Sequence, residues 1–252
     1  MGYDISPDKI VISSHVTIDF LKANRNGKRV YLLGNERLTA DFVNAGIILD
    51  DKDPDIVVLG FDTTLTYEKL RRACRFLAEG KEYIATHPDF NCPTADGFMP
   101  DTGSMMALFE AATGRKPDMI MGKPHKYTVD YLTRLLSCKK EELCFIGDRL
   151  ETDILIGQAN GIPSVLVLSG VTSPEQYKKS DIRASEVVGS LKELATLLYR
   201  QLQLHIFLCA KHITLQKTTD KQQTAPCRLF FCYRIIQISP LQPSFITRSS
   251  VS

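Results

Sequence analysis

Residues 143–153 read Leu-Cys-Phe-Ile-Gly-Asp-Arg-Leu-Glu-Thr-Asp. The first four form a continuous apolar run, which is typical of a strand that is covered on both faces. Gly147 and Asp148 end this run, and a second carboxylate, Asp153, follows five residues later at the start of a helical pattern. The stretch therefore predicts a buried strand, a tight turn and a helix, with two carboxylates beside the turn.

The same alternation of short apolar runs and longer helical patterns extends over most of the chain. A parallel sheet is the usual product of strands that alternate with helices, so the sequence predicts an α/β fold with a mainly parallel sheet. The expected strands are Lys9–Ile12, Val30–Leu33, Ile56–Leu59, Tyr83–Thr86, Leu143–Ile146 and Ser164–Leu168.

Composition excludes several classes of protein. The chain has 252 residues, 44% of them hydrophobic and 24% charged, with a formal net charge of +2, and its body up to residue 199 is mildly acidic. We therefore expect a packed core, no nucleic-acid partner and no membrane span. Seven cysteines without a CxxC pair, and an N-terminus without a secretion signal, favour free thiols and the cytoplasm.

The sequence changes in character at about Arg200. Residues 200–252 contain seven Lys and Arg but only one acidic residue, Asp220, and neither the helical nor the strand period is sustained there. We expect residues 199–252 to be a weakly structured or disordered tail that does not dock on the core as a regular element. The helix that begins near Leu191 is expected to run on to about Leu204.

The turn after residue 147 has the chemistry of a cation site. In an open parallel sheet, ligands bind beyond the carboxyl ends of the strands, where Asp148 lies. Carboxylate oxygens suit Mg²⁺, which usually takes one or two of them and keeps several waters. In the alternative, purely structural interpretation, Asp148 caps the following helix and Asp153 balances its dipole.

A lysine upstream fits the same site. Met121-Gly122-Lys123-Pro124 directly precedes a helical pattern, and Lys123 lies one helix and one strand before Asp148. Both residues can therefore reach one rim of one sheet. An ammonium there would neutralise a phosphate or a carboxylate, although a surface lysine is the more common explanation of an isolated match.

Together these motifs resemble the haloacid-dehalogenase-like (HAD) superfamily of hydrolases, in its NagD-like or para-nitrophenyl-phosphatase-like branch. The resemblance rests on Gly-Lys-Pro at 122–124, Gly-Asp-Arg-Leu-Glu-Thr-Asp-Ile at 147–154 and Val-Leu-Val-Leu-Ser-Gly-Val at 165–171. Thr-His-Pro-Asp-Phe-Asn-Cys-Pro at 86–93 and Pro-Asp-Thr-Gly-Ser at 100–104 also resemble that branch. The similarity covers about residues 3–198.

The resemblance implies a domain plan and a chemistry. It implies a partial Rossmann-like HAD core at 1–16 and 118–198, with an α/β cap domain inserted at 17–117. The activity implied is hydrolysis of small phosphorylated metabolites through an aspartyl-phosphate, with Mg²⁺ as cofactor. Lys123 would hold the phosphate charge, and Asp148 and Asp153 would hold the metal; a homo-oligomer through the cap is also implied.

The family's nucleophile is not found at the expected place. Its first motif, a strand ending in Asp-x-Asp-Gly-Thr, should precede the segment matched by residues 8–14. We therefore expect the chain as given to be N-terminally truncated and inactive alone. Three alternatives remain: a non-catalytic binding or dimerisation module, a truncated gene product, and a capless phosphotransfer site that uses Asp62 as nucleophile, since residues 56–66 read as a strand ending in Asp-x-Thr-x-Thr.

A polar cluster follows the strand that ends near Thr86. It contains His87, Asp89, Asn91 and, further on, Asp101. Such a cluster is often turn chemistry. Because loops on a rigid scaffold carry specificity, we expect His87, Asp89 and Asn91 to contact the substrate. The sequence does not choose among sugar phosphates, nucleotides and aryl phosphates.

Overall fold

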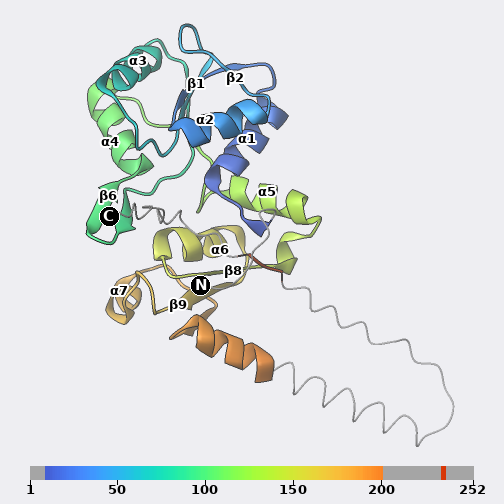
Figure 1. Cartoon of the computed structure of the whole chain (residues 1–252). Helices are drawn as coiled ribbons and strands as arrows, with labels where there is room; N and C mark the ends of the chain where they lie inside the picture. Colours follow the sequence, from blue (N-terminus) through green and yellow to red (C-terminus); the bar gives the residue numbers. More distant parts are fainter. Residues whose placement is uncertain (1–8, 201–233, 237–252) are drawn as a thin grey trace, which may run out of the picture. The chain divides into compact units, whose positions relative to one another are not determined.

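The computed structural model describes residues 9–200 and 234–236 (Figure 1). These residues form two compact units, the first ending at Cys138 and the second beginning at Lys139. Each unit is an α/β structure built on a parallel sheet. The predicted fold class is therefore confirmed.

The first unit contains a five-stranded sheet whose paired strands all run parallel. Its order is β2-β1-β3-β4-β7. Strand β2 therefore lies on one side of β1, and β3, β4 and β7 follow on the other side. Val57, Val58 and Leu59 in the central strand are fully buried, as expected for a strand covered on both faces. The strands are β1 (Arg29–Leu33), β2 (Ile48–Leu49), β3 (Ile56–Leu59), β4 (Glu82–Ala85) and β7 (Met119–Ile120).

Helices cover both faces of this sheet (Figure 1). Three of them begin at a side-chain cap: Asn35 accepts a hydrogen bond from the Leu38 amide, Thr66 from Lys69, and Asp101 from Thr102. The helices are α1 (Ser13–Asn24), α2 (Glu36–Asn44), α3 (Tyr67–Ala78), α4 (Thr102–Thr113) and α5 (Lys126–Leu136). An antiparallel hairpin, β5 (Asn91–Thr94) and β6 (Gly97–Pro100), lies between β4 and α4.

Aromatic packing joins α3 and α4 to the sheet. The ring of Tyr31 in β1 meets Phe76 edge to face at 5.1 Å, and Tyr83 in β4 meets Phe109 in the same way at 6.3 Å. Such pairs add to the stabilisation that apolar burial gives. The core cluster comprises Tyr31, Leu33, Val57, Leu59, Ala73, Phe76, Leu77, Tyr83, Met105 and Phe109.

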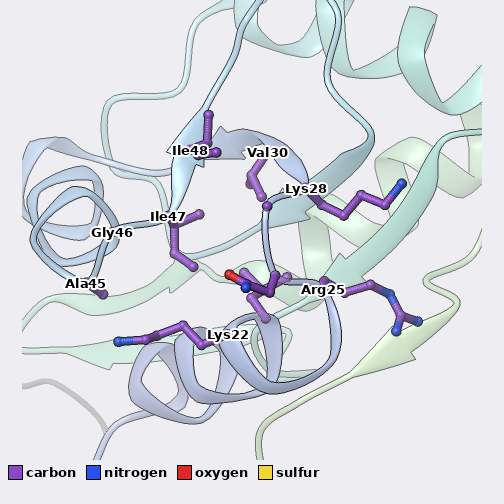
Figure 2. A pocket seen from close by; sticks show the side chains of 11 residues that line it. Lys22, Arg25, Lys28, Val30, Ala45, Gly46, Ile47 and Ile48 are labelled. Carbon is purple, nitrogen blue, oxygen red and sulfur yellow. The ribbon is translucent and has the colours of Figure 1, made fainter.

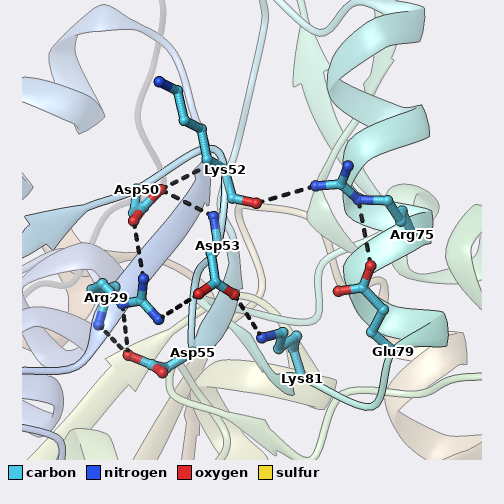
Figure 3. A network of polar contacts seen from close by, with 8 residues as sticks. All are labelled: Arg29, Asp50, Lys52, Asp53, Asp55, Arg75, Glu79 and Lys81. Carbon is cyan, nitrogen blue, oxygen red and sulfur yellow. Dashed lines mark hydrogen bonds and ion pairs between the residues drawn. The ribbon is translucent and has the colours of Figure 1, made fainter.

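Basic side chains hold the loop between β2 and β3, and Arg29 makes most of the ion pairs drawn in Figure 3. Arg29 pairs with Asp50, Asp53 and Asp55, and Lys81 reaches Asp53 at 3.2 Å. These bonds connect the acidic loop to the starts of β1 and β4. Its carboxylates are thus occupied within the fold.

Helix α5 packs within the first unit, on α1. The ring of Tyr127 meets that of Phe20 at 5.3 Å, and Arg134 pairs with Asp19. The sequence analysis placed residues 118–138 in a core together with residues 139–198. Contacts instead divide the chain after Cys138, so the division into cap and core remains a prediction.

The second unit contains a four-stranded parallel sheet in the order β10-β9-β8-β11. The π-helical turn η3 (Leu150–Ile154) and α6 (Leu155–Asn160) follow β8, and α6 ends at Gly161 with a left-handed φ of 67°. The strands are β8 (Leu143–Gly147), β9 (Ser164–Val167), β10 (Glu186–Val188) and β11 (Arg234–Ile236), and the helices include α7 (Pro174–Lys179) and residues 191–200.

Five of the six expected strands are confirmed to within one residue at each end. Lys9–Ile12 was wrong, because Lys9 lies in a 3₁₀ turn and Ile12 is the residue that precedes α1. The tail expectation fails for three residues, since Arg234–Ile236 form β11 and pair with β8. The predicted helix extension beyond residue 200 lies outside the described residues.

A buried hydroxyl offers a test of the first core. The Tyr83 hydroxyl is buried and has no hydrogen-bond partner. Replacing Tyr83 with Phe removes an unsatisfied polar group, so we expect stability to stay equal or to rise by about 1 kcal/mol in urea unfolding followed by circular dichroism. Phe109→Ala, which opens a cavity against the same ring, should cost about 3–5 kcal/mol. A clear loss of stability in Tyr83→Phe would contradict this packing.

Candidate active site

Asp148 follows β8 in the second unit, and the backbone of a neighbouring loop holds it. Its Oδ2 accepts a hydrogen bond from the Val171 amide at 2.9 Å, and its main-chain oxygen accepts one from Thr172 at 3.1 Å. The helical turn that follows begins at Leu150, after Arg149, without a side-chain cap. Asp148 is therefore not the cap of this helical turn, whereas Asp153 does lie in its first turn, as the structural interpretation expects.

Glycine at position 170 is required by this arrangement. A Cβ atom built on Gly170 would lie 1.9 Å from Asp148 Oδ2 and 2.4 Å from its Cβ, which no real side chain could tolerate. The loop backbone can approach the carboxylate only because residue 170 has no side chain. Gly170 and Val171 are thus part of the site.

Asp153 approaches the same turn from the helical side. Its Oδ2 accepts a hydrogen bond from the Arg149 amide at 3.3 Å, and a Cβ atom on Gly147 would lie 2.3 Å from the Asp153 Cβ. Asp153 lies in the π-helical turn η3, a rare geometry that is frequent at functional sites. Both predicted carboxylates therefore gather around Gly147.

This donor set suits a cation that keeps much of its own water. Asp148 Oδ1 accepts no hydrogen bond from the residues that the structure describes, whereas Oδ2 is fixed by the Val171 amide. Within residues 9–200 and 234–236, no group of three or more His, Cys, Asp or Glu side chains could enclose a metal ion. Mg²⁺ needs only one or two protein carboxylates, so these residues fit it better than a cation that demands a full protein cage.

Lys123 belongs to the first unit. It follows β7, and the preceding Gly122 donates its amide hydrogen to the Thr86 carbonyl at 2.7 Å. The end of β7 is thereby tied to the end of β4, and Lys123 is half-buried just beyond that tie. Because Asp148 and Asp153 lie in the second unit, the joining of Lys123 with them in one site remains a prediction.

The three predicted substrate residues lie at the end of β4 and the start of the hairpin. The His87 ring is hydrogen bonded through Nε2 to Asp101 Oδ1 at 2.8 Å and through Nδ1 to Thr86 at 2.8 Å and Ser13 at 3.2 Å. Asp89 accepts the Gly103 amide hydrogen at its main-chain oxygen, and Asn91 is exposed at the start of β5. Their contact with a substrate remains a prediction.

Asp101 has a perturbed acidity. Burial acts to raise its pKa, but hydrogen bonds from His87 and from Thr102, together with the His87 charge, outweigh burial and lower it. Asp101 therefore carries its negative charge where it caps α4. His87 and Asp101 were both identified from the sequence, but Ser13, which is hydrogen bonded to His87 and lies 74 residues from it in the chain, was not.

Asp62 does not have the surroundings of a nucleophile. Its side chain is completely buried, Oδ1 accepts hydrogen bonds from the Thr64 amide and hydroxyl, and Oδ2 pairs with Lys69 at 2.7 Å. Both carboxylate oxygens are thus committed to a turn and an ion pair. The capless phosphotransfer site that uses Asp62 is not favoured.

A basic pocket of the first unit lies among the ends of α1 and α2 (Figure 2). Its cavity has a volume of about 70 Å³, and Lys22, Arg25 and Lys28 contribute to its lining. Arg25 is engaged by Glu82 at 2.7 Å, and the adjoining helix ends present carbonyl groups. Lys22 lies in the last turn of α1, where a cation balances the helix dipole.

Two further expectations concern the thiols and the membrane. Cys74 and Cys144 are free thiols, and burial raises the pKa of both. These two thiols are thus less reactive than an exposed cysteine. Among the helices of the described residues, none has the length and apolar character to cross a membrane.

Comparison with known proteins extends these observations. Residues 120–194 match the HAD-hydrolase-like family model. The chain is 35% identical over 194 residues to dihydroxyacetone phosphatase of Corynebacterium glutamicum, covering 77% of this chain and 70% of that protein. It is 33% identical over 193 residues to ribonucleotide monophosphatase NagD of Escherichia coli, covering 77% and 75% respectively.

Solved structures of phosphatases are similar to this chain as well. The 4-nitrophenylphosphatase of Thermotoga maritima superimposes with a TM-score of 0.75 and 45% sequence identity, over 78% of this chain and 75% of that one. The p-nitrophenyl phosphatase of Archaeoglobus fulgidus gives a TM-score of 0.73 at 28% identity, over 78% and 77%.

Fold and site together define an α/β protein with two carboxylates at the carboxyl end of a parallel strand. The chain belongs to the HAD-like hydrolases, in their NagD-like branch.

The ion pair of Asp62 supplies a test of its structural role. Lys69→Met leaves a buried carboxylate without its charge partner and should destabilise the first unit by about 3 kcal/mol, whereas the matched Asp62→Asn keeps the turn, leaves no buried charge and should cost about 1 kcal/mol. Urea unfolding of both variants measures the difference. If Asp62→Asn proves the more harmful, the assignment of Asp62 to a turn is wrong.

Proposed function

We propose that this chain carries the cation-binding and phosphate-binding part of a Mg²⁺-dependent phosphatase that acts on small phosphorylated metabolites. The observation that supports this most strongly is the Asp148 carboxylate. One oxygen is fixed by the Val171 amide, the other accepts no hydrogen bond from the described residues, and Gly170 leaves room for the loop. Membership of a family whose named relatives are phosphatases supports the activity.

Each predicted residue receives a role in this proposal. Asp148 and Asp153 hold the cation, and Lys123 neutralises the phosphoryl oxygens. The bound cation would supply positive charge at the phosphoryl group, where charge stabilisation is the main contribution to phosphoryl transfer. The rigid turn around Gly147 keeps the two carboxylates in place without reorganisation.

The attacking group is proposed to come from a segment that this sequence does not contain. The sequence contains no Asp-x-Asp-Gly-Thr stretch, the motif that the family uses for its nucleophile and general acid. That nucleophile would attack phosphorus and form an aspartyl-phosphate, which splits one difficult displacement into two easier steps. We accordingly expect the chain alone to be inactive.

Substrate choice is assigned to the end of β4 and the hairpin that follows it. Asp89 and Asn91 are proposed to contact the substrate, with His87 behind them. The relatives are a dihydroxyacetone phosphatase, a ribonucleotide monophosphatase and a 4-nitrophenylphosphatase, and these names set the range of substrates to test. A cytoplasmic location and a homo-oligomer formed through the cap are further parts of the proposal.

Activity is the first test. The chain as given should not hydrolyse 4-nitrophenyl phosphate with Mg²⁺, because Lys123 and Asp148 stabilise a reaction without an attacking group. A fusion that supplies the N-terminal segment of the Thermotoga maritima enzyme should gain turnover. Asp148→Asn in that fusion should then lower kcat by at least roughly a hundredfold.

Other outcomes would change the proposal. Measurable hydrolysis by the bare chain that survives Asp148→Asn would show that a different site does the chemistry. A folded fusion without turnover on any of the three substrate classes would favour a non-catalytic binding or dimerisation module instead.

Cation binding tests the role of Gly170 separately. Gly170→Ala forces its new methyl group against Asp148, so we expect Mn²⁺, used as a spectroscopic substitute for Mg²⁺, to bind about ten- to a hundredfold more weakly to the fusion. Electron paramagnetic resonance of free Mn²⁺ measures this. The neighbouring exposed Ser169→Ala is the control. Equal affinity in both variants would contradict the assignment of Asp148 as a ligand.

A further inference from the structure

His87 is the most highly connected polar side chain at the end of β4. Its ring bonds to Asp101 through one nitrogen and to Thr86 and Ser13 through the other. The side chain is only 16% exposed. Since both ring nitrogens are occupied by the protein, His87 has no polar atom left for a substrate.

On its Nε2 side, the ring closes the base of the hairpin formed by β5 and β6. Asp101 directly follows β6, and its amide donates to the Phe90 carbonyl at 3.0 Å. Next to it, the Gly103 amide donates to the Asp89 carbonyl at 2.7 Å, and a Cβ atom on Gly103 would lie 2.3 Å from the Pro88 carbonyl oxygen. The hydrogen bond between His87 and Asp101 adds a side-chain contact to these backbone contacts at the base of the hairpin.

On its Nδ1 side, the ring is hydrogen bonded to the Ser13 and Thr86 hydroxyls, and the Thr86 carbonyl accepts the Gly122 amide hydrogen. Ser13 is the first residue of α1, and Gly122 is the last residue before Lys123. Gly122 packs so closely that a Cβ atom on it would lie 2.9 Å from the His87 Cβ and 2.7 Å from the Thr86 carbonyl oxygen. The His87 Cβ thus packs against Gly122, the residue directly before Lys123.

We propose that His87 is a positioning residue that couples the β5–β6 hairpin to the Lys123 segment, and that it does not contact the substrate itself. Its Nε2–H, donated to the ionised Asp101, fixes one side of the ring, and the Thr86 and Ser13 hydroxyls hold the other. A ring held at both nitrogens keeps the base of the β5–β6 hairpin in a fixed position relative to the segment that leads to Lys123. This role rests on the proposed phosphatase function, because only there do the hairpin and Lys123 act on one substrate.

Two amide variants separate the two sides of the ring. His87→Gln places an amide nitrogen near the Nε2 position and keeps the bond to Asp101, but loses the bond to Ser13. His87→Asn places its amide near the Nδ1 position and keeps the Ser13 side, but no longer reaches Asp101. His15→Asn, on α1 two residues from Ser13, is the matched control.

Hydrogen exchange of the full chain, read by mass spectrometry, measures both sides at once. We expect His87→Asn to speed exchange roughly fivefold in peptides that span residues 89–101, with little change at 10–16 and 119–125. His87→Gln should show the reverse pattern, and His15→Asn neither. Equal effects of both variants on all peptides, or no effect of either, would overturn the coupling.

Steady-state kinetics of the active fusion adds a second test, because a merely structural role of His87 would not change KM and kcat separately. His87→Asn should raise KM several-fold with kcat nearly kept, because the hairpin loosens, whereas His87→Gln should lower kcat with KM nearly kept. A rise of KM alone in both variants would instead indicate direct substrate contact by His87. If the unmodified fusion is inactive, the proposed function fails, while the exchange experiment still decides the role of His87.

Discussion

The hydrogen bond from the Val171 amide to Asp148 is the interaction on which the candidate site depends. It forms because β8 and β9 are parallel neighbours, with Gly147 opposite Leu166, so that the segments after both strands leave the sheet at the same edge. Parallel pairing alone would bring two loops near each other, but Gly170 is needed to let one backbone touch the carboxylate of the other. A charged group is thereby held at the sheet edge by fixed dipoles, which is the arrangement that charge stabilisation requires.

The first unit uses the same geometry for a different purpose. There the parallel neighbours are β4 and β7, and the segments after them meet through the Gly122 amide and the Thr86 carbonyl. Again a glycine permits the approach, this time to His87. The loop that follows β4 leads into the exposed hairpin, and the segment after β7 leads to Lys123. In the proposed function, each unit would supply one set of the groups that the reaction needs.

The sequence predicted those parts of the fold that a local pattern encodes. Continuous apolar runs such as Ile56–Leu59 and Leu143–Ile146 identified strands that are buried on both faces, and Asp148 could be placed because it directly ends one of them. The strand predicted at Lys9–Ile12 is absent, although residues 10–12 form an apolar run. Ile10 remains half exposed, and Ile12 directly precedes a helix. The two- and three-residue strands β2, β7, β10 and β11 are too short for any period. Contacts such as Val171 with Asp148 and Ser13 with His87 span 23 and 74 residues, and no spacing rule announces them.

The central claim is that Lys123, from the first unit, and the Asp148 turn, from the second, act on one phosphoryl group. A crystal structure of the fusion grown with Mg²⁺ and inorganic phosphate tests it most directly. The account predicts a cation on Asp148, a phosphate oxygen within hydrogen-bond reach of Lys123 Nζ, and less than about 10 Å between that nitrogen and the Asp148 carboxylate, the range over which charges interact appreciably. A phosphate bound elsewhere, or a lysine that remains further from Asp148 with the ligand in place, would contradict it.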